Sequence, residues 1–222
     1  MKTAILAGGL GTRMQELTSV IPKPMINIGP YPIIWHIMKH YSHYGVNEFC
    51  IALGYRGDVI KDYFLNYHSR LDDISVNLRS KEINYKNNSN LDNWIVNLID
   101  TGENTMTGGR IARIRDYLKD ETFFLTYGDG ISNIDIKVLL EFHKSHGKIG
   151  TVSAVSPPSR FGVLDIKNNN SVQSFKEKPS TNTSYINGGF FVFEPTFFDY
   201  LDTDESCILE QNPLENLAKD GQ

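Results

Sequence analysis

The sequence is poor in cysteine: Cys50 and Cys207 are the two among its 222 residues. Two cysteines are too few for a disulfide scaffold and cannot form a zinc cluster, and such sparing use fits the reducing cytoplasm. The sequence also lacks any apolar run approaching the roughly 18 residues that a membrane-spanning helix needs. Met1 leads directly into a strand-like segment and a glycine loop, which is not the pattern of a secretory leader. These absences favour a cytoplasmic globular protein whose cysteines are inert packing residues.

Positive charge is not in excess either. Lys and Arg number 22 against 26 Asp and Glu, which gives a net charge of −4. No basic face is therefore expected to attract nucleic acid or an anionic membrane, so any phosphate site must be local. The sequence shows no internal repeat and no low-complexity linker, and 40% of its residues are hydrophobic. We expect one domain spanning residues 1–222.

Short apolar runs alternate with helical patterns along the chain, which is typical of an α/β fold with a mainly parallel sheet. The segment FFLT at 123–126 reads as a central strand buried on both faces, and the polar stretch SKEINYKNNSNLDN at 80–93 as a loop or a partner-facing excursion. Apolar periodicity predicts helices from 32 to about 45, over 58–67, about 109–118, 136–147 and after Pro213. The expected strands are 3–7, 49–53, 74–78, 95–99, 123–126, a hairpin formed by 162–166 and 172–177, and 188–193.

The opening segment MKTAILAGGLGTRM places Gly8, Gly9 and Gly11 directly after the first expected strand. Such a loop lets backbone N–H groups approach an anion. The dinucleotide pattern G-x-G-x-x-G fails because its third glycine would be Met14, and the P-loop pattern fails because Thr12-Arg13 stands where Gly-Lys should be. What remains is a glycine loop with its own guanidinium at Arg13, followed by a lysine held in an extended stretch between two prolines. A plain strand-to-helix turn is the alternative.

A carboxylate follows the FFLT strand in the segment TYGDG. Asp129 would lie at the carboxyl end of a parallel strand, where open α/β sheets place their ligands, and a carboxylate with phosphates is the usual magnesium site. A simple Gly-Asp-Gly turn is the alternative. The absence of an Asp-x-Asp pattern here, since Ile131 stands in the second position after Asp129, argues against a nucleotide-sugar glycosyltransferase.

Taken together, these segments resemble the sugar-1-phosphate nucleotidyltransferase family. LAGGLGTRM followed by PKPM is similar to the family signature, whereas the WHIMK helix, TMTGGR and INGGFFVF resemble its cytidylyl-transferring branch. The resemblance implies a Rossmann-like three-layer α/β nucleotidyltransferase fold with a mainly parallel central sheet and a small β-hairpin sugar-binding region. It implies a nucleotide-binding part at about 1–130 and a sugar-phosphate-binding part at about 131–222.

The implied reaction is transfer of the cytidylyl group of CTP to α-D-glucose 1-phosphate, giving CDP-glucose and pyrophosphate, with Mg²⁺ as cofactor and a homo-oligomer, a hexamer, as the assembly. The product would feed deoxysugar synthesis for surface polysaccharide. Carried over by the resemblance, Arg13, Lys23 and Asp129 are the catalytic residues, and Asp129 is the metal ligand. The nucleotide-binding residues are Leu6, Ala7, Gly8, Gly9, Leu10, Gly11, Thr12, Arg13, Lys23, Thr105, Arg110 and Gly128. The sugar-phosphate residues are Gly162, Glu177, Lys178, Asn187 and Gly188.

Other interpretations of the same residues stay open. Arg110 could lie on an exposed helix face, and Glu177 and Lys178 on a solvated strand edge. His36, His40 and His43 share one helix but are expected at the edge of the core or on the surface rather than at a metal. Tyr63, Phe64, Tyr67 and Trp94 are expected to pack together or to form an oligomer interface. The protein could use another nucleoside triphosphate or hexose phosphate, or be a nucleotide-sugar-binding regulatory subunit without turnover.

The C-terminal end carries one more expectation. Members of the family bind Mg²⁺ with the G-D-G aspartate and a second aspartate in a later segment, but the sequence ends just after the last expected helix. Asp220 lies in a Lys-Asp-Gly helix terminus and is no substitute. We expect the native protein to continue with a few tens of residues that carry the second carboxylate.

Overall fold

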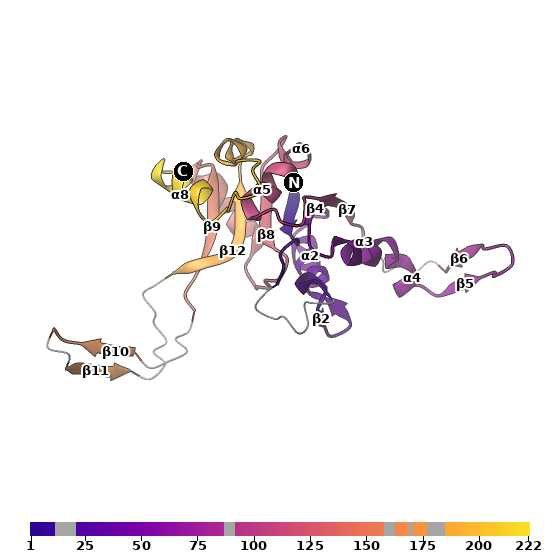
Figure 1. The fold of residues 1–222 in the computed structure, drawn as a ribbon, viewed down its shortest axis with the longest axis horizontal. Coiled ribbons are helices and arrows are strands. Elements are labelled where there is room, and N and C mark those ends of the chain that lie inside the picture. Colours follow the sequence, from indigo (N-terminus) through magenta and orange to yellow (C-terminus); the bar gives the residue numbers. More distant parts are fainter. Residues whose placement is uncertain (12–20, 87–91, 158–162, 169–170, 177–184) are drawn as a thin grey trace. The chain divides into compact units, whose positions relative to one another are not determined.

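The computed structural model describes residues 1–11, 21–86, 92–157, 163–168, 171–176 and 185–222 (Figure 1). The chain forms two compact units. The larger consists of Met1–Thr151 and Phe191–Gln222, and the smaller of Val152–Phe190.

A six-stranded sheet organises the chain, with its strands in the order β7-β4-β1-β8-β12-β9. The pairs β1 with β4, β1 with β8, and β4 with β7 are all parallel, as the alternating sequence pattern predicts. The carboxyl ends of these four strands therefore meet at one edge of the sheet. The strands are β1 (Lys2–Leu6), β4 (Glu48–Leu53), β7 (Ile95–Asp100), β8 (Phe123–Tyr127), β9 (Gly150–Val155) and β12 (Ile186–Phe193).

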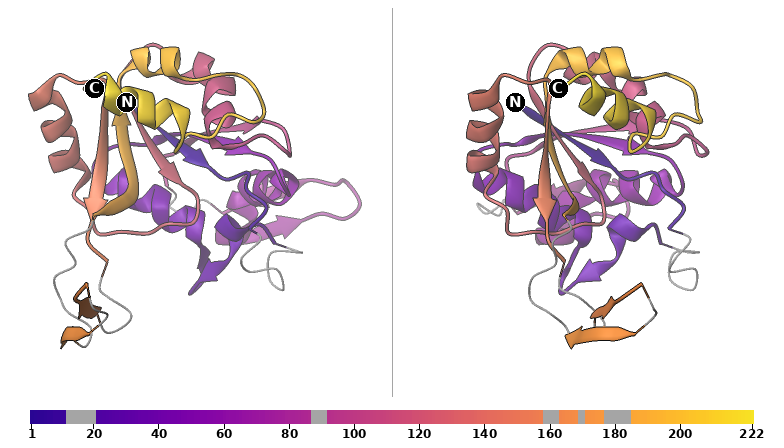
Figure 2. Two further views of the ribbon diagram at one scale, coloured as in Figure 1. Left: turned by 60° about the vertical axis from the view of Figure 1, so that its left-hand side comes forward. Right: turned by 90° about the vertical axis from the view of Figure 1, so that its left-hand side faces the viewer.

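Helices cover both faces of the sheet, which gives the expected three layers; in the right-hand view of Figure 2, α7 and α8 lie on opposite sides of the strands. Helix α7 is closed by Gly147 in the left-handed conformation, as its position after the last apolar turn predicts. The helices are α2 (Ile33–His43), α3 (Gly57–Leu65), α4 (Tyr67–Leu71), α5 (Thr107–Arg113), α6 (Arg115–Leu118), α7 (Ile136–His146) and α8 (Asn212–Lys219), with 3-10 turns η2 (Lys23–Met25) and η3 (Pro195–Tyr200).

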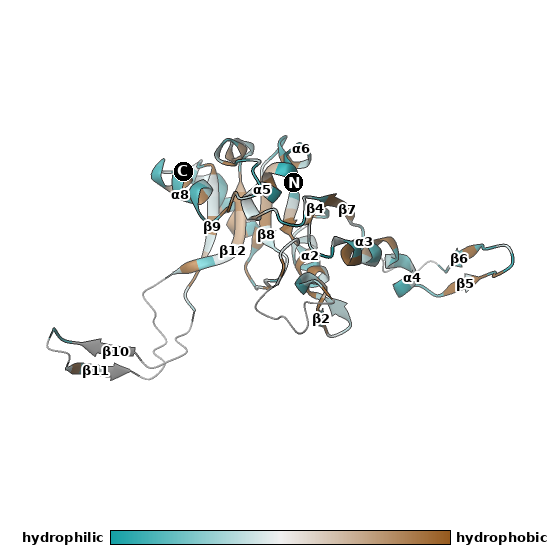
Figure 3. Cartoon of the chain, in the orientation of Figure 1, coloured by the Kyte–Doolittle hydropathy of each residue, from teal (hydrophilic) through white to brown (hydrophobic). Residues whose placement is uncertain are grey.

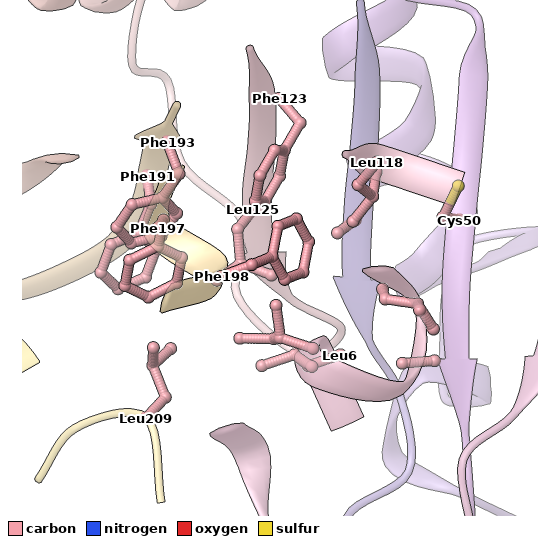
Figure 4. Close-up of a cluster of buried hydrophobic side chains, with 14 of the residues drawn as sticks. Leu6, Cys50, Leu118, Phe123, Leu125, Phe191, Phe193, Phe197, Phe198 and Leu209 are labelled. Atoms are coloured by element: carbon pink, nitrogen blue, oxygen red, sulfur yellow. The ribbon is translucent and has the colours of Figure 1, made fainter. Parts of the chain in front are cut away.

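The main core lies on one face of the sheet. Alternate residues of the strands point to it, as Leu6 of β1 and Leu125 of β8 do, and the side chains of α5, α6, η3 and α8 cover them (Figure 4). The rings of Phe193 and Phe197 stack with centroids 3.8 Å apart. On the other face Tyr41 of α2 packs against Phe124, with ring centroids 5.5 Å apart. The segment 123–126 is thus buried on both faces, as expected of a central strand.

A hairpin within the larger unit has one apolar face. Its strands β5 (Ile74–Val76) and β6 (Ile83–Tyr85) pair in antiparallel register, and both carry brown apolar segments in Figure 3. The register sets Ile74 opposite Tyr85 and Val76 opposite Ile83, so these four residues share one face. Each is about half exposed.

The smaller unit contains the hairpin that the sequence predicts, formed by β10 (Val163–Ile166) and β11 (Val172–Lys176) in antiparallel register. The short pair β2 (Asn27–Ile28) and β3 (Tyr31–Pro32) precedes α2. The described residues contain no helix long and apolar enough to cross a membrane.

Several elements differ from the sequence-based expectation. The helix expected at about 109–118 is divided at Ile114 into α5 and α6, and β2, β3, α4 and η3 were not expected. Strand β6 lies inside the polar stretch expected to be a loop or a partner-facing excursion. Its three residues show no strand pattern of their own, because pairing with β5 stabilises the strand. Strand β9 was not expected. It lies at the edge of the sheet, where buried and exposed residues alternate, and it therefore lacks the continuous apolar run of a central strand. Lys23 opens a 3-10 turn rather than lying in an extended stretch; Pro22 before it is extended and Pro24 fits the first helical turn.

Candidate functional site

A cleft of about 410 Å³ lies at the carboxyl ends of β1 and β8. Three segments supply most of its lining: the glycine loop, residues 6–11, the 103–107 segment with Arg110, which we call the 103–107 wall, and residues 127–129, which we call the 127–129 wall. Lys23 and Pro24 complete the lining. The fold therefore brings Asp129, the expected metal ligand, together with most of the nucleotide-binding residues expected from the sequence: Leu6, Ala7, Gly8, Gly9, Leu10, Gly11, Lys23, Thr105, Arg110 and Gly128. Thr12 and Arg13 lie outside the described residues.

Lys23 and Asp129 form an ion pair at the cleft, with Nζ and Oδ2 2.5 Å apart. Their side chains are 34% and 37% exposed, so both are accessible to a ligand. The two residues are 106 positions apart in the sequence; the 3-10 turn supplies one and the end of β8 the other. The ammonium of Lys23, on its flexible side chain, is suited to bind phosphate oxygens. The carboxylate of Asp129 beside it is suited to bind a divalent ion.

The glycine loop is shaped by its neighbours. A side chain at Gly8 would place a Cβ 2.3 Å from the guanidinium of Arg110, and one at Gly128 would lie 2.9 Å from the Leu6 carbonyl oxygen. A Cβ at Gly9, in contrast, would meet nothing within 4 Å. Gly8 and Gly128 are thus required by packing around the cleft, whereas the backbone at Gly9 is open to an approaching anion.

Arg110 lies at the centre of this packing. Its side chain is buried, with 4% of the residue exposed, so the interpretation as an exposed helix face is wrong. Its Nη1 donates to the carbonyl oxygens of Leu53 and Gly102 and to the Thr101 hydroxyl, at 2.7–2.9 Å, and its Nη2 to the carbonyl oxygens of Gly8 and Glu103 at 2.9 and 3.0 Å. The guanidinium therefore joins the glycine loop to the ends of β4 and β7.

Burial also acts on the charge of Arg110. Desolvation lowers the pKa of the guanidinium, and the nearby charge of Arg113 adds to the effect. An arginine nevertheless stays protonated in a protein, and the ring of carbonyl oxygens compensates the buried charge. Arg110 also lines the cleft. Its contact with a nucleotide stays a prediction.

Close packing against the 204–209 segment explains two further glycines, Gly108 and Gly109 in the TMTGGR segment. A Cβ at Gly108 would lie 2.5 Å from the sulfur of Cys207, and one at Gly109 2.6 Å from the carbonyl oxygen of Asp204. The backbone N–H groups of both glycines donate to the Cys207 carbonyl oxygen. The start of α5 is thus covered by the 204–207 segment. Thr105 is buried beside it and accepts a hydrogen bond from Arg113 at 2.7 Å.

Sequence reasoning missed several residues of the cleft. Tyr127 and Thr107 line its walls, and Glu103, Asn104 and Met106 border it. Tyr127 could have been found because it directly precedes Gly128 and Asp129 on the same strand. Glu210 contacts the hydroxyls of Tyr127 and Thr107, and no local pattern in the sequence points to it.

The expected sugar-phosphate residues are only partly described. Gly162, Glu177 and Lys178 lie outside the described residues. Asn187 and Gly188 belong to β12 in the smaller unit, and the Asn187 side chain accepts a hydrogen bond from the backbone of Gly189 at 2.8 Å. A Cβ at Gly188 would lie 2.6 Å from the Ser153 hydroxyl oxygen, so close strand packing already requires this glycine. A role toward a sugar stays a prediction for all five.

Within the described part of the chain, no group of three or more His, Cys, Asp or Glu side chains could hold a metal ion. His36 and His40 are half-buried and His43 is exposed, which matches the expected positions at the edge of the core or on the surface. His40 lies against the rings of Tyr41 and Tyr44. Burial lowers the pKa of His40. The aromatic residues Tyr63, Phe64, Tyr67 and Trp94 contact one another as expected. Cys50 is buried and its pKa is raised to about 11, which agrees with an inert thiol.

A family model described as nucleotidyl transferase matches residues 2–217. The chain belongs to the nucleotidyl transferase family. Two similar proteins are the glucose-1-phosphate cytidylyltransferase of Salmonella typhimurium, 49% identical over all of this chain and 86% of its own length, and a probable glucose-1-phosphate cytidylyltransferase of Bacillus subtilis, 45% identical over the same shares. Both matches cover the chain from end to end, so the cleft belongs to a nucleotidyltransferase enzyme.

Structural similarity agrees with this assignment. The crystal structure of HddC from Yersinia pseudotuberculosis, complexed with GMP-PN, matches with a TM-score of 0.66 at 27% identity, covering 95% of this chain and 84% of that one. A putative glucose-1-phosphate thymidylyltransferase from Bacillus anthracis matches with a TM-score of 0.64 at 21% identity, covering 100% of this chain and 84% of that one. With the family match, this shows that the three-layer fold with a mostly parallel sheet is that of the nucleotidyltransferases, as the sequence resemblance implied.

Proposed function

We propose that this protein transfers the cytidylyl group of CTP to α-D-glucose 1-phosphate and releases pyrophosphate, with CDP-glucose as product. The observation that carries the proposal is the Lys23–Asp129 pair beside an open glycine loop in one cleft. The identity of 49% and 45% over all of this chain to two proteins named as glucose-1-phosphate cytidylyltransferases, one of them as probable, supports the choice of base and sugar.

The chemistry asks for position and charge rather than for a protein nucleophile. An oxygen of the sugar phosphate attacks the α-phosphorus of CTP while pyrophosphate leaves on the opposite side. In our proposal the ammonium of Lys23 lies beside the α-phosphate and neutralises the charge that is redistributed there. The backbone around Gly9 and Gly11 receives the phosphates, and Arg13 holds the leaving pyrophosphate.

The residues present fit a magnesium ion held by Asp129. Its carboxylate is partly exposed at the end of β8 and already receives a cation, the ammonium of Lys23, at 2.5 Å. When bound, Mg²⁺ neutralises phosphate charge and orients the triphosphate. Asp129 would hold the ion together with phosphate oxygens and water, while Lys23 turns to the phosphate.

The acceptor side is proposed from the sequence. Lys178 would bind the phosphate of glucose 1-phosphate and Glu177 a sugar hydroxyl, while Gly162, Asn187 and Gly188 would border the pyranose. We expect Lys178→Ala to raise the KM for the sugar phosphate and to leave CTP affinity nearly unchanged, which steady-state kinetics with each substrate varied would check. An equal effect on both substrates would contradict this placement.

We further propose a homo-oligomer that acts in the cytoplasm, where CTP and sugar phosphates are made, and that supplies a nucleotide sugar to deoxysugar synthesis for surface polysaccharide. The β5–β6 hairpin supports the assembly, because a two-stranded hairpin is marginal in water unless its apolar face is covered. Its face of Ile74, Val76, Ile83 and Tyr85 is about half exposed in the single chain. Analytical ultracentrifugation of wild type and Val76→Asp would test this, with a monomeric wild type contradicting it.

A pyrophosphate-release assay tests the function directly. The protein is mixed with glucose 1-phosphate and, in turn, CTP, UTP, ATP, GTP or dTTP in the presence of Mg²⁺, with Lys23→Ala as the blank. We expect release with CTP to exceed release with each other triphosphate. Preference for another triphosphate would make the protein a different nucleotidyltransferase, and CTP binding without any release would make it a regulatory subunit.

A further inference from the structure

Glu210 joins the two walls of the cleft. Its Oε1 accepts a hydrogen bond from the Tyr127 hydroxyl at 2.5 Å, and its Oε2 accepts one from the Thr107 hydroxyl at 2.8 Å. Tyr127 and Thr107 both line the cleft. Glu210 itself is exposed and comes from the segment between η3 and α8, 83 positions after Tyr127 and 103 after Thr107.

These two walls do not meet through the sheet. Thr107 begins α5, which follows β7, whereas Tyr127 ends β8. In the strand order, β4 and β1 lie between β7 and β8, and the glycine loop leaves β1 between the two walls. The carboxylate of Glu210 is thus a direct polar bridge across the strand that carries the loop.

The directions of the bridging hydrogen bonds are fixed by their neighbours. The backbone N–H of Leu209 donates to the Thr107 hydroxyl oxygen at 2.9 Å, so the hydroxyl hydrogen is left for Glu210. A carboxylate accepts both hydroxyl hydrogens, one on each oxygen, and such charge-assisted bonds are stronger than neutral ones. A shorter or neutral side chain would lose one of the two contacts.

The bridge lies on an independently anchored segment, the strap 204–210. Its main chain receives the N–H groups of Met106, Gly108 and Gly109 through the Glu205 and Cys207 carbonyl oxygens at 2.8–3.1 Å, and Leu209 is fully buried. Replacing the Glu210 side chain therefore leaves the strap attached to α5 and removes the contact to Tyr127.

We propose that Glu210 is a positioning residue, which sets the distance between the 103–107 wall and the 127–129 wall and so the fit of the nucleoside triphosphate. This inference rests on the proposed function, because it needs a triphosphate in the cleft. Through Tyr127 the bridge orients the strand end that carries Asp129, and through Thr107 it fixes the start of the helix that carries Arg110.

The test separates span from charge. Glu210→Asp keeps the charge but is one methylene shorter, Glu210→Ala removes both, and Tyr127→Phe removes one hydroxyl. Glu215→Asp is the matched control, because Glu215 is an exposed helix residue paired with Lys219 at 3.8 Å. We expect Glu210→Asp and Glu210→Ala each to raise the KM for CTP about tenfold, the loss of one or two hydrogen bonds, with the KM for the sugar phosphate unchanged.

A double-mutant cycle gives the second readout. Because Tyr127 acts through Glu210, the Tyr127→Phe/Glu210→Ala double variant should bind CTP as weakly as Glu210→Ala alone in isothermal titration calorimetry. Additive effects of the two substitutions, or a wild-type KM for CTP in Glu210→Asp, would overturn the proposal. A lowered Tm with unchanged KM values would show a purely structural contact. A wild-type protein that turns over no triphosphate would instead contradict the proposed function.

Discussion

Two polar networks lie at opposite ends of the same sheet, and they differ in how fully their groups are used. At the carboxyl end of β8, Lys23 and Asp129 face a cleft and are each about a third exposed. At the amino end, the side chains of Thr122, His143, His146, Thr151 and Glu194 form a continuous chain of hydrogen bonds, and His143 is 1% exposed.

The histidine network has one consistent direction. The Lys148 backbone N–H donates to His146 Nδ1, so the His146 hydrogen is on Nε2 and is donated to the Thr151 hydroxyl at 2.7 Å. The Thr151 hydroxyl then donates to His143 Nδ1 at 2.8 Å, and His143 Nε2 donates to Glu194 at 3.0 Å. Thr122 also donates to Glu194.

The comparison teaches how to separate structural polar groups from reactive ones. A network in which each donor meets an acceptor stabilises the fold and has nothing left for a ligand. A partly exposed pair in a cleft costs little to separate and can exchange its partner for substrate. The Nη1 and Nη2 groups of Arg110 belong to the first kind, although Arg110 lines the cleft and its contact with a nucleotide stays a prediction. The following substitutions test this division.

The largest effect is expected for Arg110→Ala. The change removes a buried guanidinium that donates to four carbonyl oxygens and to the Thr101 hydroxyl. The Leu53 and Gly8 carbonyl oxygens keep backbone donors, Thr101 and Tyr55, but the Gly102 and Glu103 carbonyl oxygens lose the guanidinium, and we expect a loss of about 3–5 kcal/mol in the free energy of unfolding. Urea unfolding followed by circular dichroism measures it. Arg115→Ala is the control, since Arg115 is exposed on the next helix, with its guanidinium 5.6 Å from the Phe198 ring centroid. Equal stability of both variants would remove Arg110 from the structural group.

Lys23→Ala should show the opposite profile. Because the Lys23–Asp129 pair is partly exposed, its loss should change the free energy of unfolding by less than about 1 kcal/mol. We expect kcat to fall roughly a hundredfold or more, with little change in the Kd for CTP, because the charge acts mainly in the transition state. Lys39→Ala, which breaks the Lys39–Asp92 contact of 2.6 Å, should keep its activity. A loss confined to KM would contradict the role given to Lys23.

The sequence alone predicted the parts of the site that come from continuous segments. The glycine loop and Asp129 each follow a strand whose apolar pattern is clear, so their meeting at one sheet edge follows from parallel topology. Lys23, on the 3-10 turn η2, was instead expected from the family resemblance. Arg110 and Glu210 act through backbone carbonyls and hydroxyls brought together from distant segments, which no local pattern encodes. The edge strand β9 and the three-residue strand β6 were missed for the same reason, since pairing rather than composition stabilises them.

A smaller effect is expected for Thr151→Val in the histidine network. The substitution keeps the shape of the side chain but leaves His146 Nε2 without an acceptor and His143 Nδ1 without a donor. We expect a loss of about 1–3 kcal/mol in the free energy of unfolding and an unchanged kcat, because the network lies away from the cleft. Ser145→Ala removes an exposed hydroxyl of α7 that donates to the Phe142 carbonyl oxygen, and it should be nearly neutral. A lower kcat in stable Thr151→Val would show that the two ends of the sheet communicate.

The smallest effect concerns pH. Partial burial lowers the pKa of His146, and the nearby His143 and Lys148 add to the shift. A small pocket lined by His143 and Lys148 also has the ammonium of Lys144 and the carboxylate of Glu194 in its lining. In the unfolded chain a histidine titrates near its ordinary value of about 6.5. Above that pH His146 is neutral in both states and the full stability is present. As the pH falls below it, the unfolded chain takes up the proton first, so the free energy of unfolding decreases until the lower pKa of the folded state is passed.

His40, whose pKa is also lowered, contributes in the same direction, so the wild-type slope alone does not isolate His146. Urea unfolding of wild type and His146→Gln between pH 5 and pH 8 would do so, because glutamine cannot titrate. We expect the stability of the variant to depend less steeply on pH below about 6.5. An unchanged slope would mean that protonation of His146 is tolerated, and that the hydrogen bond from Lys148 to its Nδ1 is replaced without cost.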